Sequence, residues 1–529
     1  MLTIHNLSYI HPDKELLFSN INATVAADEK IALIGNNGSG KSTLLKIITG
    51  ILEPAGGAIR ADTEVYYVPQ IFGQYNHLTI AEALGVDRKL KALYEILNGS
   101  VSEKNYDVLN DDWEIEERCA QALKYWKLSE SDLAQPMETL SGGQKTKVLL
   151  AGILIHTPQL VLLDEPSNHL DFFGRRLLYD FIQSTKSTLL IVSHDRKLLN
   201  LLDRTYELSK HGIKVYGGNY DFYTEQKKIE ESALDHDIQA KEKALKKAKE
   251  KERETIERQQ KLDIRGRAKQ EKSGVARIMM NTLRNSAEKS TAKLKGVHTE
   301  KISDIKQELQ ELRASVSDID QMKFGFDNSK LHKGKNLFVA EGINFRYENK
   351  DYLWDNHLDL KIVSGERIVI KGANGSGKTT LINLILGNLT PSVGTVVIAS
   401  EISSYIDQDY SLIKGEFSVY DQAQEYNTNG LLEHEVKIRL NRFLFDQEQW
   451  TKPCHILSGG ERMRLALCCL SIGYQSPDII ILDEPTNNLD IQNIEILTHA
   501  INGYQGTLLV VSHDEIFLNE IRIERAIEL

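Results

Sequence analysis

The chain has 529 residues, which is too many for a single hydrophobic core, so we expect two or three domains. Hydrophobic residues make up 41% and charged residues 26%, the balance of an ordinary globular protein, and the absence of an apolar run of about 18 residues predicts no membrane segment. The four cysteines have no C-x-x-C spacing, which argues against a zinc site or a disulfide framework.

A phosphate-binding loop is predicted near the start of the chain. Residues 35–42 fit the pattern G-x-x-x-x-G-K-[ST], after an apolar run at 31–34 that predicts a strand and before a run at 43–48 that predicts a helix. The glycines let backbone N–H groups surround phosphate oxygens, Lys41 supplies a positive charge, and the Ser42 hydroxyl supplies a ligand for Mg²⁺. The predicted binding residues are Gly35, Asn36, Asn37, Gly38, Ser39, Gly40, Lys41, Ser42 and Thr43.

The same pattern recurs 337 residues later, so the chain is a tandem repeat. The second loop follows a strand-like run at 368–370. A glycine-rich turn with an exposed lysine is the alternative for either match, but two matches in the same context favour two nucleotide sites. The second set of predicted binding residues is Gly372, Ala373, Asn374, Gly375, Ser376, Gly377, Lys378, Thr379 and Thr380.

Later landmarks repeat at a constant offset of 319 residues. Asp-Glu-Pro at 164–166 returns at 483–485, and Ser-His-Asp at 193–195 returns at 512–514. Gln70 and Gln408 are 338 apart, so about twenty residues are extra in the first copy, and we place this insertion at about 95–115. The short apolar runs before the landmarks are typical of strands buried on both faces of a parallel sheet, which predicts an α/β fold for each copy.

The acidic pair after a buried strand predicts phosphoryl-transfer chemistry in each copy. We expect the first acid to hold Mg²⁺ and the second to polarise the attacking water. A histidine follows the next strand and is expected to contact the γ-phosphate; a structural histidine is the alternative, but its repeated distance from the acidic pair favours function. These residues are Asp164 and Asp483 for the metal, Glu165 and Glu484 for the water, and His194 and His513 for the phosphate.

A charged stretch without proline lies between the copies, at about 221–320. It begins with a helix-forming run to about Arg265, and Gly266 and Gly274 predict a turn. A returning helix carries apolar residues at alternating spacings of 3 and 4, which is a heptad seam. The seam consists of Ile302, Ile305, Leu309, Leu312, Val316 and Ile319. We therefore expect an antiparallel helical hairpin with coiled-coil packing.

The net charge of −11 is unevenly distributed along the chain. Residues 241–295 contain 18 basic and 8 acidic residues, a net charge of +10, so the rest of the chain carries −21. The expected tip of the hairpin holds the basic residues Arg265, Arg267, Lys269, Lys272, Arg277, Arg284, Lys289, Lys293 and Lys295 and the apolar residues Ile278, Met279, Met280 and Leu283. A basic, partly apolar tip favours contact with a polyanionic partner, and a solvated spacer is the alternative.

These motifs together resemble the ATP-binding-cassette superfamily, over about 1–220 and 337–529. The resemblance implies two P-loop ATPase domains, at 1–220 and 326–529, joined by a linker at 221–325, with ATP and Mg²⁺ as cofactors. It implies that each phosphate loop faces the signature segment of the other copy, which consists of Ser141, Gly142, Gly143 and Gln144 or of Ser458, Gly459, Gly460 and Glu461. Tyr9 and Tyr347 are expected to stack on adenine. The metal ligands are expected to be Ser42, Gln70 and Asp164 in one site and Thr379, Gln408 and Asp483 in the other.

Within the superfamily the chain resembles the ABC-F class, on the Ser-Asn-His-Leu-Asp and Thr-Asn-Asn-Leu-Asp segments at 167–171 and 486–490 and on the charged linker. The resemblance implies a cytosolic protein that binds the ribosome near the exit-tRNA site. Its linker tip would contact ribosomal RNA and tRNA near the peptidyl-transferase centre. A short insertion with a long linker resembles the antibiotic-resistance members of the class. An internal cassette pair makes a monomer sufficient.

Two other classes of protein stay open. A fused ATPase of a membrane importer, with separate permease chains, would have the same cassettes but a short linker. A DNA-maintenance ATPase would join its cassettes by a far longer coiled coil, so duplex DNA is not expected as a partner.

Overall fold

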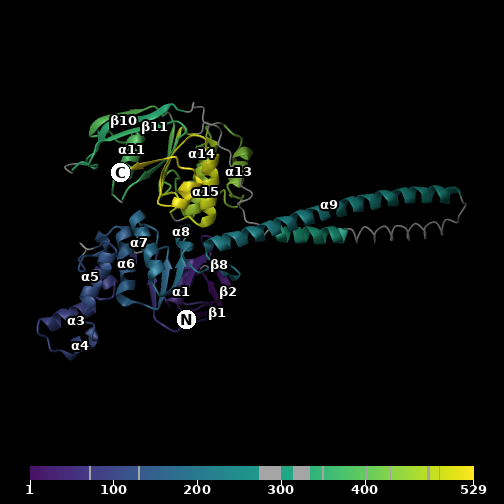
Figure 1. Cartoon of the computed structure of the whole chain (residues 1–529). Helices are drawn as coiled ribbons and strands as arrows, with labels where there is room; N and C mark the ends of the chain where they lie inside the picture. Colours follow the sequence, from purple (N-terminus) through teal and green to yellow (C-terminus); the bar gives the residue numbers. More distant parts are fainter. Residues whose placement is uncertain are drawn as a thin grey trace. The chain divides into compact units, whose positions relative to one another are not determined.

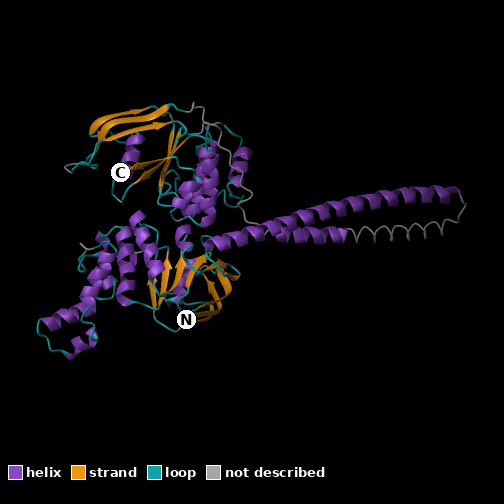
Figure 2. Ribbon diagram, viewed as in Figure 1, coloured by secondary structure: helices purple, strands orange, loops and turns teal. Residues whose placement is uncertain are grey.

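The computed structural model describes the whole chain except residues 13, 71–72, 129–131, 273–298, 314–333, 348–350, 374, 401, 429, 474–476 and 488. The chain divides into two compact units, Met1–Phe222 with Gln321–Leu529, and Tyr223–Asp320. The first unit holds both phosphate loops and mixes helices with strands, and the second is helical where it is described (Figures 1 and 2). This confirms the expected fold class, two α/β cassettes joined by a long helical linker.

The first cassette contains two sheets. An antiparallel sheet has the order β2-β1-β4, and a six-stranded sheet has the order β5-β6-β7-β3-β8-β9, in which only β9 runs antiparallel to its neighbour. The strands are β1 (Leu2–Ile10), β2 (Leu16–Val25), β3 (Lys30–Ile34), β4 (Gly56–Ala61), β5 (Val65–Val68), β6 (Leu160–Asp164), β7 (Thr188–Val192), β8 (Arg204–Ser209) and β9 (Gly212–Tyr216). Every residue of β6 and β7 is buried, so the prediction of strands covered on both faces is confirmed.

The helices of the first cassette connect these strands. They are α1 (Lys41–Ile48), α2 (Ile80–Ala83), α3 (Asp87–Leu97), α4 (Glu103–Leu109), α5 (Ile115–Tyr125), α6 (Gly142–His156), α7 (Phe172–Ser184) and α8 (Arg196–Leu199). The first turn of α6 is the predicted signature segment, and α7 follows the acidic pair at the end of β6.

The second cassette repeats this plan. Its antiparallel sheet has the order β11-β10-β13, and its parallel sheet has the order β14-β15-β16-β12-β17. The strands are β10 (Asn336–Asn344), β11 (Leu358–Val363), β12 (Arg367–Lys371), β13 (Val393–Ile398), β14 (Ser403–Ile406), β15 (Ile479–Asp483), β16 (Thr507–Val511) and β17 (Arg525–Glu528). The helices are α11 (Lys378–Ile385), α12 (Val419–Glu425), α13 (Glu433–Arg442), α14 (Gly459–Ile472), α15 (Ile491–Gly503) and α16 (Glu515–Glu520).

The insertion in the first cassette consists of helices. Isolated bridges at Thr79–Pro136 and Ser418–Pro453 mark equivalent places in the two cassettes. Between them the first cassette has α2, α3, α4 and α5, whereas the described part of the second has α12 and α13. The predicted insertion at 95–115 covers the end of α3, all of α4 and the first residue of α5, so α4 is the helix that lies wholly within it.

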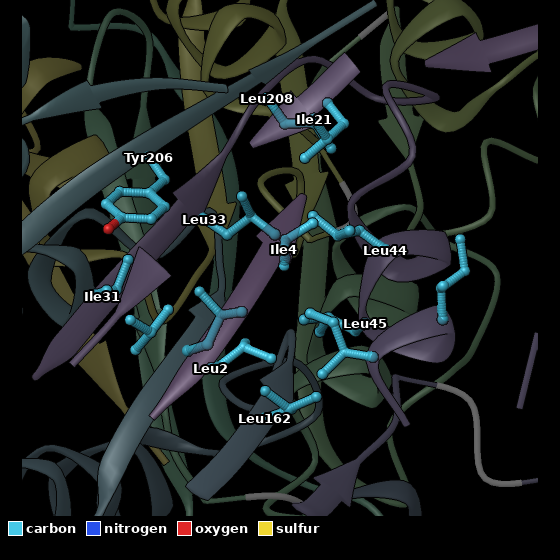
Figure 3. Packing of buried hydrophobic residues seen from close by; sticks show 14 of the residues in the cluster. Leu2, Ile4, Ile21, Ile31, Leu33, Leu44, Leu45, Leu162, Tyr206 and Leu208 are labelled. Carbon is cyan, nitrogen blue, oxygen red and sulfur yellow. The ribbon is translucent and has the colours of Figure 1, made fainter. Parts of the chain in front are cut away.

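A buried cluster supports the first phosphate loop (Figure 3). Leu44 and Leu45 of α1 belong to the same cluster as Leu33 of β3 and Leu162 of β6. The equivalent cluster of the second cassette contains apolar residues of α11, β12 and β15. The strand before the loop and the helix after it are therefore anchored in one core, which fixes the loop between them.

The linker is built on one long helix, α9 (Tyr220–Lys272), of 53 residues. Gly266 lies inside α9, so the predicted turn at this residue is wrong: one glycine costs about 1 kcal/mol in a helix, which a helix of this length tolerates. Residues 299–313 form the returning helix. Its Ile302 and Leu309 are buried and Arg313 Nη2 lies 2.5 Å from Glu242 of α9, which confirms the antiparallel heptad seam in the described residues.

Several predictions for the linker lie outside the described residues. They are Gly274, Arg277, Ile278, Met279, Met280, Leu283, Arg284, Lys289, Lys293, Lys295, Val316 and Ile319, together with the boundary at 325. In the part of the chain that the structure describes, none of the helices combines the length and the apolar character needed to cross a membrane.

Candidate nucleotide-binding sites

The first phosphate loop connects β3 to α1 and closes on its own lysine. Lys41 Nζ donates hydrogen bonds to the backbone oxygens of Gly35, at 2.7 Å, and Asn36, at 3.2 Å. Lys378 Nζ makes the two equivalent bonds in the second cassette, both 2.9 Å long. The two loops thus hold a positive charge in the same position, on the concave side where backbone N–H groups gather.

Glycine is required where each loop becomes a helix. Gly40 has a φ of +96°, and a Cβ there would lie 2.8 Å from side-chain atoms of Leu17 and Phe18. Gly377 has a φ of +93°, and its Cβ would lie 2.4 Å from Leu353. Both the left-handed backbone and the close packing exclude a larger residue, which explains why the second fixed glycine of the pattern is needed.

The donors of both loops fit the phosphates of a nucleotide. Helices α1 and α11 begin at Lys41 and Lys378, and the preceding Gly40 and Gly377 provide no side-chain cap, so first-turn N–H groups are left for a ligand. The hydroxyl oxygens of Ser39 and Ser376 are buried and have no hydrogen-bond partner among the described residues. Uncapped N–H groups beside a lysine form an anion-binding site, and this arrangement fits ATP in both cassettes.

Each metal-binding aspartate predicted from the sequence receives a hydrogen bond from a tyrosine. Asp164 Oδ1 accepts a hydrogen bond from Ser42 Oγ at 3.1 Å, and its Oδ2 accepts one from the Tyr67 hydroxyl at 3.2 Å. In the second cassette the Tyr405 hydroxyl donates to Asp483 Oδ2 at 2.9 Å. Sequence reasoning did not single out either tyrosine, although the two occupy the same position of the repeat.

The predicted catalytic glutamate and histidine face each other in both cassettes. His194 Nε2 lies 3.3 Å from Glu165 Oε1, and His513 Nε2 lies 3.2 Å from Glu484 Oε1. The His194 backbone N–H also donates to Glu165 Oε2 at 3.2 Å. The ends of two adjacent parallel strands, β6 and β7, bring this pair together, as the repeated spacing in the sequence predicts.

Both glutamates adopt a strained backbone conformation. Glu165 has a φ of +52° and Glu484 a φ of +47°, in the left-handed region that residues with a Cβ rarely occupy. The backbone N–H of Glu165 donates to Val192 at 2.8 Å, and that of Glu484 donates to Val511 at 2.8 Å, so the neighbouring strand holds each strained residue. Strain of this kind concentrates at functional sites.

Burial changes the proton affinity of these groups. It raises the pKa of Glu165 to about 8 and that of Glu484 to about 7, and it lowers the pKa of His194 and lowers that of His513 to about 4. The imidazoles are therefore neutral, and each glutamate holds a proton more readily than an exposed glutamate does.

A cavity of about 370 Å³ contains most of the first predicted site. Its lining includes Ser42, Gln70 and Asp164, so the three predicted metal ligands are brought together. Ser458 of the second signature segment also lines it, and Asp490 Oδ2 accepts a hydrogen bond from the Asn37 backbone N–H at 2.9 Å. Residues of the second cassette therefore take part in the first site. The remaining lining residues are His11, Leu17, Asn37, Gly38, Gly40, Lys41, Thr43, Glu165, Asn168, Val192 and His194.

Tyr9 and His11 form a pair of aromatic residues beside the first site. Tyr9 packs against Phe18, with ring centroids 6.3 Å apart, and His11, two residues later, lines the cavity. The edge-to-face pair of Tyr9 and His11 corresponds to that of Phe345 and Tyr347 in the second cassette. His11 is therefore the counterpart of Tyr347 in the repeat. The contact of Tyr9 and Tyr347 with adenine stays a prediction.

The signature segments are helix N-termini with capping boxes. Ser141 caps α6 by accepting a hydrogen bond from the Gln144 backbone N–H at 3.3 Å, and the Gln144 side chain accepts one from Ser141 N at 2.9 Å. Ser458 and Glu461 make the same reciprocal pair at α14. Gln144 and Glu461 thus cap their own helices, and their predicted contact with nucleotide stays a prediction. The glycines between, Gly142, Gly143, Gly459 and Gly460, form the first helical turns.

Fewer of the predicted residues are joined at the second site. The Tyr347 hydroxyl lies 2.9 Å from Thr380 Oγ1, at the start of α11. Thr379 and Gln408 are both exposed, and the described hydrogen bonds link neither to Asp483. Gly375 has a φ of +84°, and Asn374 lies outside the described residues. The roles assigned to these residues and the pairing of Ser141 with the second loop stay predictions.

The fold and the paired loops define a tandem nucleotide-binding protein of the P-loop class. The family model described as ABC transporter matches residues 18–168 and 356–487, more than half of the chain. Among curated relatives, the putative ATP-binding protein YdiF of Bacillus subtilis is 32% identical over 97% of this chain and 78% of that protein. ABC transporter F family member 5 of Arabidopsis thaliana is 31% identical over 96% and 71%.

A solved structure shares the tandem fold. The archaeal ribosome recycling factor aABCE1, in complex with the ribosomal stalk protein aP1, superposes with a TM-score of 0.60 over 99% of this chain and 87% of that chain, at 18% identity. This likeness concerns the fold alone. The chain belongs to the ABC transporter family, and within it to the F class of tandem-cassette proteins. It is an ATPase, since ATP hydrolysis is the general activity of the family.

Proposed function

We propose that this ATPase binds the ribosome near the exit-tRNA site and contacts ribosomal RNA and tRNA with its linker, as a translation factor or a ribosomal protection protein. The charge distribution carries the proposal. Residues 241–295 have a net charge of +10 in a chain whose remainder carries −21, so the attraction to a polyanion is confined to one segment. Phosphate contacts by lysine and arginine dominate affinity for nucleic acids.

The described part of the linker supports this proposal. Lys243, Lys246, Lys247 and Lys249 of α9 are exposed, whereas Leu245 is partly covered on the side of the seam. Helix α9 offers a long surface for such contacts, since 53 helical residues span about 80 Å at 1.5 Å per residue. That archaeal aABCE1, which shares the fold, is a ribosome recycling factor also favours a ribosomal role.

The chemistry assigned to each site follows from its geometry. Lys41 and the N–H groups of α1 bind the phosphates, and Ser42, Gln70 and Asp164 would hold Mg²⁺, which supplies charge neutralisation for the phosphates when it is bound. Glu165 orients a water molecule and accepts its proton. In the second cassette the same roles fall to Lys378, Thr379, Gln408, Asp483 and Glu484.

We propose that ATP draws the two cassettes together and so favours ribosome binding, whereas hydrolysis releases the protein. The Ser458 side of the second cassette lines the first site, so a nucleotide there would contact both cassettes. A variant that binds ATP without hydrolysing it should therefore stay on its target.

The test uses the double variant Glu165→Gln/Glu484→Gln, sedimented with purified bacterial ribosomes in ATP, in ADP and without nucleotide. We expect co-sedimentation in ATP alone. A matched control, Lys41→Ala/Lys378→Ala, should bind neither ATP nor ribosomes. If the glutamine variant binds ATP and yet stays in the supernatant, the ribosomal proposal is wrong. Recovery of permease subunits from membranes in stoichiometric amounts would then favour an importer ATPase.

A second experiment tests whether the protein is a ribosomal protection protein or a general translation factor. Cells that express the chain are grown with ribosome-targeting antibiotics, one drug at a time. Raised resistance to a drug, lost in the glutamine variant, would indicate ribosomal protection. Unchanged resistance to every drug, together with ribosome binding, would indicate a general translation factor.

A further inference from the structure

We infer that Tyr67 and Tyr405 are positioning residues of the two ATPase sites, in which the tyrosine hydroxyl holds the carboxylate of Asp164 or Asp483 in the orientation that binds the metal. The inference rests on the proposed metal role of the two aspartates. It adds one residue to each site. This tyrosine belongs neither to the phosphate loop nor to the acidic pair, and the position of the histidine does not predict it.

The sheet register explains why the tyrosine reaches the aspartate. Tyr67 of β5 pairs with Leu162 of β6, and Asp164 lies two residues further along β6. Because side chains alternate along a strand, Leu162 and Asp164 face the same side of the sheet as Tyr67. Tyr67 and Asp164 are therefore diagonal neighbours, at a separation that a long aromatic side chain can span. The resulting distance from the hydroxyl to Oδ2 is 3.2 Å.

The second cassette contains the same arrangement independently. Tyr405 of β14 pairs with Ile481 of β15, and Asp483 follows two residues later. The hydroxyl to Oδ2 distance is 2.9 Å. The two cassettes share little sequence on these edge strands outside this position, so the recurrence of tyrosine at the diagonal place points to a shared role.

The hydrogen bond restricts how the carboxylate can rotate. In the first site, Asp164 accepts from Ser42 at Oδ1 and from Tyr67 at Oδ2. Because the Tyr67 hydroxyl holds Oδ2, Oδ1 stays directed at the hydroxyl of Ser42 in the phosphate loop. That hydroxyl is itself a proposed metal ligand. Groups that hydrogen-bond to metal ligands orient them and strongly affect metal affinity.

A purely structural role for the ring is the competing explanation. Both tyrosines are partly buried and pack against the hydrophobic cluster of their own cassette. Replacement by phenylalanine separates the two explanations, because it keeps the ring and removes the hydroxyl alone.

The neighbouring residue provides a matched control. Tyr66 lies on the opposite face of β5, and its hydroxyl donates to the backbone oxygen of Leu149 at 2.9 Å. The second cassette has Ser404 in that position, so this tyrosine is not part of the repeat. Tyr66→Phe removes a comparable buried hydroxyl from the same strand without touching the aspartate.

The experiment measures the binding of a fluorescent ATP analogue to the full chain, with increasing Mg²⁺ and in EDTA. In Tyr67→Phe/Tyr405→Phe we expect the Mg²⁺ concentration for half-maximal enhancement to rise about tenfold, the range seen when groups behind metal ligands are removed. Affinity in EDTA should be unchanged. Tyr66→Phe should keep the wild-type Mg²⁺ dependence. The Mn²⁺ electron paramagnetic resonance spectrum of the bound metal should change in the double variant alone.

The outcomes separate this inference from the proposed site. If Asp164→Asn/Asp483→Asn leaves the Mg²⁺ dependence unchanged, the metal role of the aspartates is wrong. If the asparagine variant loses the dependence but the double phenylalanine variant matches wild type, only the tyrosine inference is overturned. An equal loss of affinity with Mg²⁺ and in EDTA would show that the ring packing matters instead. Should the double variant fail to fold, Tyr67→Phe and Tyr405→Phe are titrated singly, and wild-type behaviour in both overturns the inference.

Discussion

His194 and Glu165 form a close pair at the ends of two adjacent strands, with Nε2 3.3 Å from Oε1, and His513 and Glu484 repeat it at 3.2 Å. Burial keeps the imidazoles neutral because it lowers the pKa of both histidines. A neutral imidazole beside a carboxylate can orient that group and a bound water without adding a charge.

Removal of these imidazoles should slow hydrolysis more than it weakens binding. We expect His194→Ala/His513→Ala to lower kcat about 100-fold, within the range for groups that assist proton transfer. The dissociation constant for ATP should change far less. Steady-state ATPase assays and equilibrium binding measure the two quantities. The exposed His211 is the control, and His211→Ala should leave both unchanged. Equal losses of binding and turnover would argue for a structural histidine.

The phosphate loops should not tolerate a methyl group at the start of the helix. In Gly40→Ala/Gly377→Ala a Cβ meets packed side chains at 2.8 Å and 2.4 Å, so we expect loss of ATP binding. Gly50 has a similar φ of +74°, but a Cβ there has nothing within 4 Å. Gly50→Ala should therefore show only the backbone strain, about 1–2 kcal/mol, and keep ATP binding. Calorimetric titration with ATP and thermal unfolding distinguish these effects, and equal behaviour of the two variants would contradict the packing argument.

A partly buried carboxylate, that of Asp112, lies beside the inserted helices. Asp112 accepts hydrogen bonds from Lys89 Nζ and Arg118 Nη2, both at 2.8 Å. Burial opposes its ionisation, but these two bonds prevail and hold its pKa below the ordinary value of 3.8. A lowered pKa stabilises the folded insertion above the unfolded pKa, and this contribution is lost as the pH falls through the folded value.

We therefore expect Asp112→Asn to destabilise the insertion by about 1–3 kcal/mol at neutral pH and to match wild type in strong acid. Hydrogen exchange of the amides of α3 and α5 measures this local stability. The exposed Asp107 of α4 is the control, and Asp107→Asn should exchange like wild type. If the amides of the Asp112→Asn variant are as well protected as those of wild type at neutral pH, the ion pairs contribute nothing to the stability of the insertion.

Truncation of Leu309 should destabilise the heptad seam of the linker. This residue is 5% exposed in the helical pair, and Leu309→Ala should destabilise the hairpin by about 2 kcal/mol, the lower end for buried leucines. Leu262 on α9 is 52% exposed, and Leu262→Ala should have no effect. Circular dichroism of the full chain during heating monitors the loss of helix. ATP turnover without ribosomes should be unchanged in both variants, and a drop in turnover at Leu309→Ala would mean that the seam supports the cassettes.

The sequence predicts those parts of the site that a local pattern specifies. The phosphate loop, the acidic pair and the histidine each end a buried strand, and the ends of parallel strands meet at one edge of a sheet. Asp164, Glu165 and His194 could therefore be placed together from spacing alone. The tyrosine at 67 depends on which strand pairs with β6 and in which register, information that the sequence of β5 does not contain.

Two predictions depend on structure beyond the local pattern. Tyr9 packs against Phe18 while His11 lines the cavity, and the adenine contact of Tyr9 stays a prediction. Gly266 predicts a turn because glycine disfavours helices, and this is wrong because that preference is small beside the contribution of a helix of 53 residues. The Ser141 and Gln144 capping box was visible in the sequence as a serine followed three residues later by glutamine.

The positive φ of Glu165 and Glu484 has a consequence for selection and engineering. At both positions glycine or asparagine would adopt the same backbone with less strain, so the resting fold gains stability when the residue proposed to activate water is lost. A screen for heat resistance that ignores turnover should collect substitutions at these two positions. Natural sequences that keep glutamate at both positions would then be retained by selection for hydrolysis and not by selection for a stable chain.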